Sequence, residues 1–380
     1  MPLQSMEARP IQGGAASGPS NQGSEMIKNT YRLQLASPAF LGDADQRGAW
    51  RTPPLKALIR EWWRIAVAPE LGYDVSTLKV REKYLFGTAA DDSREGNQKS
   101  RIRLKLSDWH QGTCTHWEAG EARVTHREVK DRNTGKARPV GAELYLGYGP
   151  LVFQQGTQLK NGAALQSKDS NTLKLAFPEI HADELACALS LAHWFGTVGG
   201  RSRNGWGSLC WQALENSPAL PTLTKAALQQ TGCVRPLTRC LDLDWPHAIG
   251  NDGKGVLVWQ STQTFANWRD AMRFLAQTKI DFRVGLGFVG GQPHREPQAR
   301  HVLAYPVTNH KVPAWEGKDK GRLANTLRFK LHAEADGTLR ALIYHTPCKP
   351  TLPHHGIDLL DTWQQVHRHL DTTPQLTRLA

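Results

Sequence analysis

Two successive parts of this 380-residue sequence repeat a similar order of strand-like and helix-like patterns. Alternating apolar residues predict half-buried strands, whereas apolar residues at helical spacing predict amphipathic helices. In the first part, strands are predicted at 31–35, 171–177 and 206–214, with helices at 52–67 and 181–196. In the second part, strands are predicted at 239–245, 255–262 and 300–307, helices at 265–278 and 356–370, and a hairpin at 325–347. Crossover helices mixed with hairpins favour an α+β fold of two ferredoxin-like (RRM-like) domains over one long parallel sheet.

Composition predicts where these parts begin and end. Residues 1–26 are rich in Gly, Ser, Pro and Gln and poor in large apolar side chains, so they are predicted to form a disordered leader. Residues 27–214 are predicted to form the first domain and residues 237–380 the second. The weakly patterned, proline-containing segment 215–236 is predicted to connect them. A basic hairpin at 123–149 is predicted as an insertion in the first domain.

Cations outnumber anions in the chain. The sequence has 47 Lys and Arg residues against 35 Asp and Glu residues, a formal net charge of +12. This excess favours a polyanionic partner, with nucleic acid ahead of a membrane surface, although charge that only maintains solubility is the alternative. We find no secretory signal, no run of ~18 apolar residues and no C-x-x-C pair, so a cytoplasmic protein without membrane contact is predicted.

A glycine-rich segment, GTVGGRSRNGWGSLCW at 196–211, follows a predicted helix and leads into a predicted strand. Dinucleotide-binding and P-loop motifs place their glycines between a strand and the start of a helix, so the reversed order argues against both. Glycine still permits close approach to a ligand, while the other side chains add donors and a stacking face. The residues predicted to lie along a sugar-phosphate chain are Gly199, Gly200, Arg201, Ser202, Arg203, Asn204 and Trp206. A helix C-cap with a tight turn is the structural alternative.

Two further groups of cations are candidates for contact with RNA. Lys56, Arg60 and Arg64 fall four apart along one stripe of the helix predicted at 52–67, away from its apolar face, and Arg51 directly before this helix is a fourth candidate. Arg127 and Lys130 belong to the basic hairpin, which is long enough to reach over an RNA groove or a neighbouring subunit. A solvated charged arm is the alternative for the hairpin.

Two segments, LASPAFLGDADQRGAWRTPPLKALIREWWRIAV at 35–67 and GGRSRNGWGSL at 199–209, resemble the RAMP superfamily of CRISPR systems. The second segment is similar to the glycine-rich signature loop of that superfamily. The first is similar to the opening of the first subunit of Cmr-type, or type III-B, effector complexes, with an Arg-x-Pro start at Arg51 and an Arg-x-Trp-Trp-Arg run at 60–64. The C-terminal part matches only in a general way, as a second RAMP-like domain.

This resemblance implies two RAMP-type domains and a place at the end of a multisubunit complex. There the chain would hold the 3′ region of CRISPR RNA and assist capture of complementary target RNA, with other RAMP subunits as neighbours. The loop residues 201–204 and Trp206 match the part of the family loop that faces RNA, and Arg60 and Arg64 match basic helix positions. Trp62 and Trp63 match the tryptophan pair, although the phase of Trp62 favours core packing.

Catalysis is the minority alternative. Asp43 and Asp45 lie after the first predicted strand. RAMP subunits that cleave target RNA look to carry their aspartate at this position, but the resemblance to the first subunit implies no such role. His367 and His369 stand two apart on a predicted helix and therefore face different ways, which argues against a metal site. The chain is predicted to bind RNA without a cofactor or metal. An endoribonuclease and a protein-protein scaffold are the other hypotheses.

Overall fold

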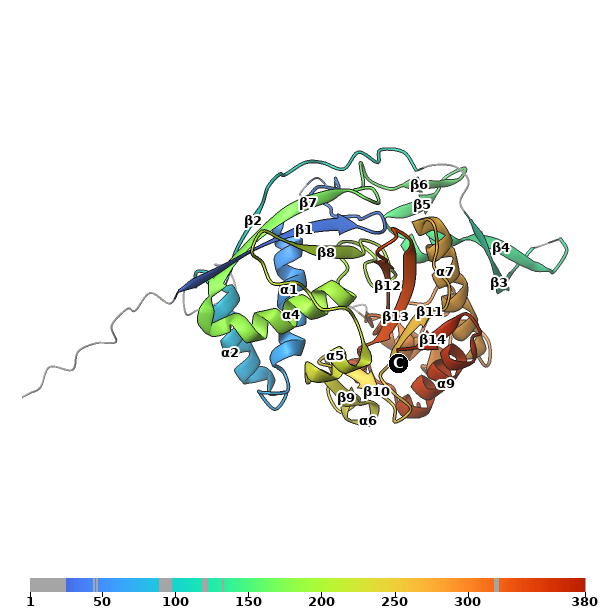
Figure 1. The fold of residues 1–380 in the computed structure, drawn as a ribbon. Coiled ribbons are helices and arrows are strands. Elements are labelled where there is room, and N and C mark those ends of the chain that lie inside the picture. The colour runs from blue at the N-terminus through green and yellow to red at the C-terminus, as the bar shows by residue number, and fades with distance from the viewer. Residues whose placement is uncertain are drawn as a thin grey trace, which may run out of the picture.

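The first half of the protein is built on a four-stranded antiparallel sheet (Figure 1). The computed structural model describes residues 25–43, 45, 47–88, 98–117, 122–131, 133–317 and 321–379, so most of the leader predicted at 1–26 lies outside the described residues. The sheet has the strand order β2-β7-β1-β8. Its elements are β1 (Met26–Leu35), α1 (Thr52–Val67), α2 (Val75–Phe86), β2 (Arg103–Leu106), β7 (Ser170–Pro178), a 3-10 turn (Glu179–His181), α4 (Ala182–Phe195) and β8 (Leu209–Leu214).

The local patterns explain these elements. In β1, Tyr31, Leu33 and Leu35 are buried, as the period-two pattern predicts. The apolar stripe of α1 is buried against α4 and the sheet, with both Trp62 and Trp63 in the core. The helix begins at Thr52 as predicted, with Arg51 at the N-cap position and proline in its first turn, where the missing N–H costs no helical hydrogen bond.

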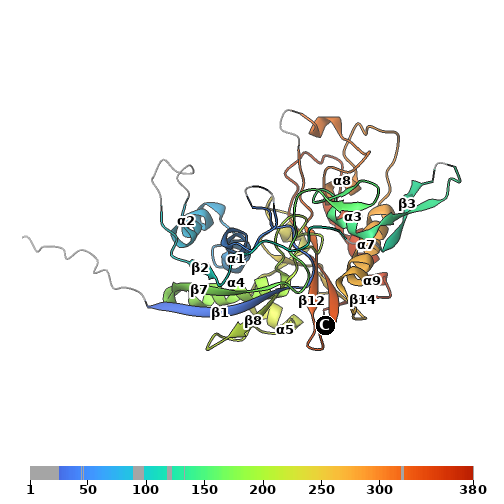
Figure 2. The same ribbon diagram turned by 90° about the horizontal axis from the view of Figure 1, so that it is seen from above.

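An excursion between β2 and β7 carries two small ribbons and a short helix. Its elements are β3 (Arg123–Lys130), β4 (Ala137–Gly141), α3 (Ala142–Gly147), β5 (Leu151–Phe153) and β6 (Thr157–Leu159). Strands β3 and β4 pair in antiparallel fashion, as do β5 and β6. The β3-β4 ribbon projects from the body of the molecule in both views (Figures 1 and 2).

The second half is built on another four-stranded antiparallel sheet, in the order β12-β13-β11-β14. Its elements are α5 (Lys225–Gln230), β9 (Val234–Pro236), α6 (Leu237–Cys240), β10 (Ile249–Asn251), β11 (Val258–Ser261), α7 (Trp268–Gly285), α8 (Ala299–Leu303), a 3-10 turn (Pro313–Trp315), β12 (Leu327–Ala333), β13 (Leu339–His345), α9 (Leu359–Thr372) and β14 (Leu376–Arg378). Both halves mix helices and strands, which confirms the α+β class. Among the described helices, none combines the length and the apolar character needed to cross a membrane.

Two strands predicted in the second half are wrong. The segment 300–307 begins as helix α8, because Gln298 and His301 form a reciprocal capping box that starts a helix turn. The segment 239–245 begins in the one-turn helix α6 and continues as turns instead of forming a strand. In both cases, the apolar pattern is too short to distinguish strand from helix.

The hydrophobic cores do not divide at the predicted connection. Leu228 and Cys233 of the predicted connection at 215–236 belong to the same core as the first sheet. Conversely, Leu146 and Trp206 pack with residues of α7 and the second sheet. Each half therefore contributes side chains to the core of the other, and the two halves share a large interface.

Candidate nucleic-acid interface

The glycine-rich loop connects the end of α4 to the start of β8. Gly199 and Gly207 have positive φ angles of 88° and 63°. A Cβ atom on Gly207 would lie 2.0 Å from the carbonyl oxygen of Val198, and one on Gly199 would lie 2.7 Å from that of Phe40. The glycines are thus required for tight packing of the loop, which supports the structural alternative for these positions.

The second part of the loop, residues 204–208, is buried. Trp206 has no exposed surface and packs against Phe40, Trp117 and Trp268, with ring centroids 5.0, 5.7 and 5.6 Å away. Asn204 donates to the carbonyl of Leu146 at 2.8 Å and accepts from Nζ of Lys279 at 2.7 Å. The prediction that Asn204 and Trp206 face RNA is therefore wrong for this structure, because the second half of the molecule covers both side chains.

The first part of the loop is open. Arg201 is exposed and holds a positive φ of 57°, and its guanidinium lies over the backbone of Gly149. Tyr148 beside it is 65% exposed. Arg322 from the second half faces Arg201, so burial and the charge of Arg322 together lower the pKa of Arg201. Lys160 is exposed and its backbone bonds to Pro150, which packs under Gly200. We call Tyr148, Lys160, Arg201 and Arg322 the loop-tip patch.

Further cations lie below the loop-tip patch. Burial and the nearby charges of Arg283 and Arg201 hold the pKa of Lys279 well below its usual range. Arg283 is also buried, and Arg300 forms an ion pair with Glu128. Burial lowers the pKa of Lys279 more than the neighbouring charges do, so the cations available to an anion are those of the loop-tip patch. An exposed aromatic ring beside exposed cations suits a nucleotide chain, in which stacking and phosphate contacts alternate.

Ser202 and Arg203 occupy an intermediate position in the loop. Both are half-buried, and the backbone carbonyl of Arg203 accepts from the N–H of Phe329 in β12. Burial and the charge of Arg328 lower the pKa of Arg203, and Glu61 acts in the opposite direction. Arg203 therefore lies at the interface between the halves, where its charge is partly compensated.

The cationic stripe of α1 is divided in the structure. Arg64 makes a two-pronged ion pair with Glu82 of α2, and this hydrogen bond raises the pKa of Arg64. Arg51 donates to the carbonyl of Gly42. Both side chains were predicted to contact RNA, but each is bonded to a partner within the protein. Arg60 lies 3.7 Å from Glu82 and, with Lys56, lines a cavity of about 680 Å³ at the junction of α1 and α2.

The remaining predicted residues lie elsewhere. Arg127 and Lys130 are exposed on β3. Helices α1 and α2 and the β3-β4 ribbon occupy opposite sides of the molecule (Figure 2). Asp43 accepts the backbone N–H groups of Asp45 and Arg47, and Arg47 pairs with both carboxylates. The predicted residues therefore form several separate groups.

Sequence reasoning missed Tyr148, Lys160, Lys279 and Arg322. Tyr148 stands between two glycines in LGYGP, a weak indication of a tight turn with an exposed ring. Lys279 and Arg283 both lie just beyond the end of the helix predicted at 265–278 and stand four apart, so they share a face if that helix continues. No comparable pattern surrounds Arg322.

Comparison with known proteins gives a family match for the first half of the chain. Residues 32–210 match the model of the RAMP superfamily. No curated protein matches the sequence. Among solved structures, the crystal structure of Cmr1 from Pyrococcus furiosus in its apo form is similar, with 13% identity, coverage of 93% of this chain and 98% of that chain, and a TM-score of 0.45. A chain of the type III-B Cmr-beta complex bound to cognate target RNA has 11% identity, coverage of 91% and 100%, and a TM-score of 0.46. The match of residues 32–210 to the RAMP superfamily model agrees with the resemblance carried by the glycine-rich loop, which lies within this range.

Proposed function

We propose that the protein is an RNA-binding subunit of a type III CRISPR effector complex. In this proposal it holds the 3′ region of the guide RNA and assists capture of complementary target RNA, beside other RAMP subunits. The match of residues 32–210 to the RAMP superfamily model supports the class of protein. The observation that carries the RNA-binding role is the loop-tip patch, where the ring of Tyr148 is exposed beside the exposed cations Arg201 and Arg322.

The strand order supports the finer part of the fold prediction. In each half, the order along the chain is strand, helix, two strands, helix, strand, and the first strand lies between the third and fourth. This is the split β-α-β arrangement of ferredoxin-like folds. We therefore propose two ferredoxin-like domains, with the β3-β4 ribbon as a basic insertion in the first.

Arg201→Ala tests the assignment of the loop-tip patch. We expect a loss of about 3- to 10-fold in affinity for a synthetic guide RNA, and a salt dependence of binding that is shallower by about one unit of slope. Filter binding between roughly 50 and 300 mM salt measures both quantities. The matched control is Arg368→Ala, because Arg368 is also exposed but lies near Asp361 on α9. Equal slopes in Arg201→Ala and the unmodified protein would contradict the assignment.

Our proposal assigns binding, not cleavage, to this chain. Asp43 and Asp45 are both engaged by Arg47, which favours a structural role for these two carboxylates. Incubation of the purified protein with guide RNA and with target RNA should therefore leave both intact. Specific products that disappear in Asp43→Ala or Asp45→Ala would favour the endoribonuclease hypothesis.

A further inference from the structure

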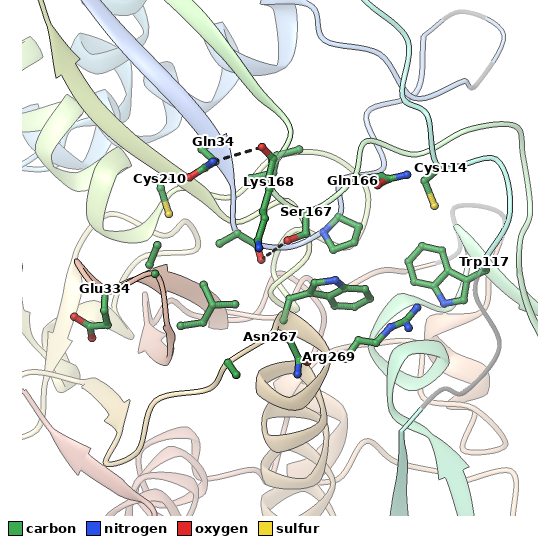
Figure 3. A pocket seen from close by; sticks show the side chains of 18 of the residues that line it. Gln34, Cys114, Trp117, Gln166, Ser167, Lys168, Cys210, Asn267, Arg269 and Glu334 are labelled. Carbon is green, nitrogen blue, oxygen red and sulfur yellow. Dashed lines mark hydrogen bonds between the residues drawn. The ribbon is translucent and has the colours of Figure 1, made fainter.

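A cavity of about 670 Å³ lies between the two halves of the molecule (Figure 3). The first half contributes the end of β1 and the segments 114–117 and 166–168, and the second half contributes 266–269 and the β12-β13 turn. Its volume falls in the range of small-molecule sites, ~300–1,000 Å³. The residues that line this space indicate which kind of ligand it could bind.

One wall of this inter-half pocket is aromatic. Trp117 and Trp268 both line it, and their ring centroids are 6.0 Å apart in an edge-to-face arrangement. Trp206 stands 5.7 Å from the first ring and 5.6 Å from the second, and it is fully buried. Trp117 and Trp268 are only half-buried, so indole surface remains available to a planar ligand.

Glu143 of α3 holds this wall in place. Its side chain has no exposed surface, and one carboxylate oxygen accepts from the indole nitrogen of Trp117 at 2.5 Å. The other oxygen lies 3.1 Å from Nε of Arg269, whose guanidinium is 5.1 Å from the ring of Trp268. A buried carboxylate is costly unless its partners are fixed. The geometry of Trp117, Arg269 and Trp268 is therefore set before any ligand arrives.

The rim of the pocket favours an anion. Lys168 lines it, is exposed, and has a φ of 74°, which is unfavourable for a residue with a side chain. Helix α7, 18 residues long, begins at the pocket with Asn267 as its N-cap. The side chain of Asn267 accepts the N–H of Asp270, and the Asp270 carboxylate lies in the same first turn, so an anion at the rim would meet Lys168 rather than this helix end. The single carboxylate among the lining residues belongs to Glu334, which pairs with Arg340.

We propose that the inter-half pocket binds one nucleotide, with its base on the Trp117 and Trp268 wall and its phosphate toward Lys168. Two sources share this chemistry: a nucleotide turned out of a bound RNA strand, and a free nucleoside monophosphate. The first source rests on the proposed function. Phe40 links the two surfaces, because it packs on Gly200 in the open part of the loop and its ring centroid is 6.0 Å from that of Trp117.

Photocrosslinking tests the RNA source. A guide RNA that carries single 4-thiouridines at successive positions is bound to the protein, irradiated and mapped by mass spectrometry. We expect one position to crosslink to the peptides of Trp117 or Trp268. Trp117→Leu should lower that crosslink about tenfold, as expected from loss of a stacked base. The matched control is Trp109→Leu, because Trp109 is 66% exposed and lies outside the pocket.

Titration with AMP and UMP by calorimetry tests the free source. If Lys168→Ala and Trp117→Leu both weaken mononucleotide binding, the pocket is supported whether or not RNA binds. If the mononucleotide binds in this way and RNA does not bind, only the proposed function is contradicted. RNA binding that depends on Arg201, with neither a pocket crosslink nor mononucleotide binding, would overturn the pocket and leave the proposed function standing. Crosslinks that persist unchanged in Trp117→Leu would also overturn it.

Discussion

The two halves share one strand order but differ in the connection that precedes their last strand. In the first half, residues 196–208 connect α4 to β8, whereas in the second half residues 373–375 connect α9 to β14. The longer connection is the glycine-rich loop. It leaves its own sheet and reaches the edge of the other, where Phe329 and Leu331 of β12 donate to Arg203 and Ser208.

The comparison shows how one loop can serve two purposes. Its buried part, which contains Asn204 and Trp206, joins the two halves, and its open part presents Arg201 to solvent. In the second half, the short connection leaves no room for either purpose. Candidate binding residues therefore gather where the first half departs from the shared topology, as is usual for loops on a rigid scaffold.

The largest expected effect comes from Trp206→Ala. If the loop joins the halves, loss of this fully buried ring should lower the free energy of unfolding by about 3–5 kcal/mol. Urea denaturation followed by circular dichroism measures the change. Trp109→Ala is the control, because Trp109 is 66% exposed and its loss should change stability by less than about 0.5 kcal/mol. Similar effects of the two substitutions would break the comparison.

The opposite sign is expected for Lys330→Met. Lys330 of β12 is fully buried, donates to the carbonyl of His193 at the end of α4, and has a pKa lowered by burial to about 7. The unfolded chain binds a proton at this lysine up to about pH 10.4, so stability should rise between about pH 7 and pH 10. We expect Lys330→Met to stabilise the protein at pH 7 by about 1–2 kcal/mol and to remove that rise.

Thermal unfolding from pH 7 to pH 10 provides the test of Lys330. Lys105→Met on the edge strand β2 is the control, because Lys105 is exposed. A rise in stability with pH that persists in Lys330→Met would show that this lysine is charged in the folded protein. A charged Lys330 at the contact of β12 with α4 would then need a negatively charged partner nearby.

Periodicity was sufficient to predict β1, α1, β7, α4 and β8 of the first half, whereas residues 142–147 of the predicted hairpin form helix α3 instead. Helix α1 spans 52–67 as predicted, because its apolar residues repeat over four turns and bury one face. Helix α8 was missed because five residues are too few for a period to emerge. The site was only partly predictable for a different reason. Tyr148, Arg201, Lys279 and Arg322 are distant in the sequence, and only the packing of the two halves brings them together.

Burial was the other quantity that the sequence concealed. Arg201 and Trp206 stand five positions apart in a segment of uniform composition, yet one is exposed and the other has no exposed surface. The difference arises from β12 and α7, which cover one end of the loop. A local pattern cannot report contacts made by segments more than sixty residues away.

The smallest expected effect concerns the ion pair between Glu61 of α1 and Arg328 of β12, which joins the halves beside the loop. Burial acts to raise the pKa of Glu61, but Arg328 outweighs burial and holds that pKa below its usual value. The pair therefore stabilises the protein above about pH 4.5, and this contribution disappears as the pH falls through the lowered pKa. Because the carboxylate is partly exposed, we expect Glu61→Gln to cost only about 1 kcal/mol at pH 7. Urea unfolding at pH 7 and pH 3 should show this difference shrink, whereas a constant difference would mean that Glu61 acts through packing and not through charge.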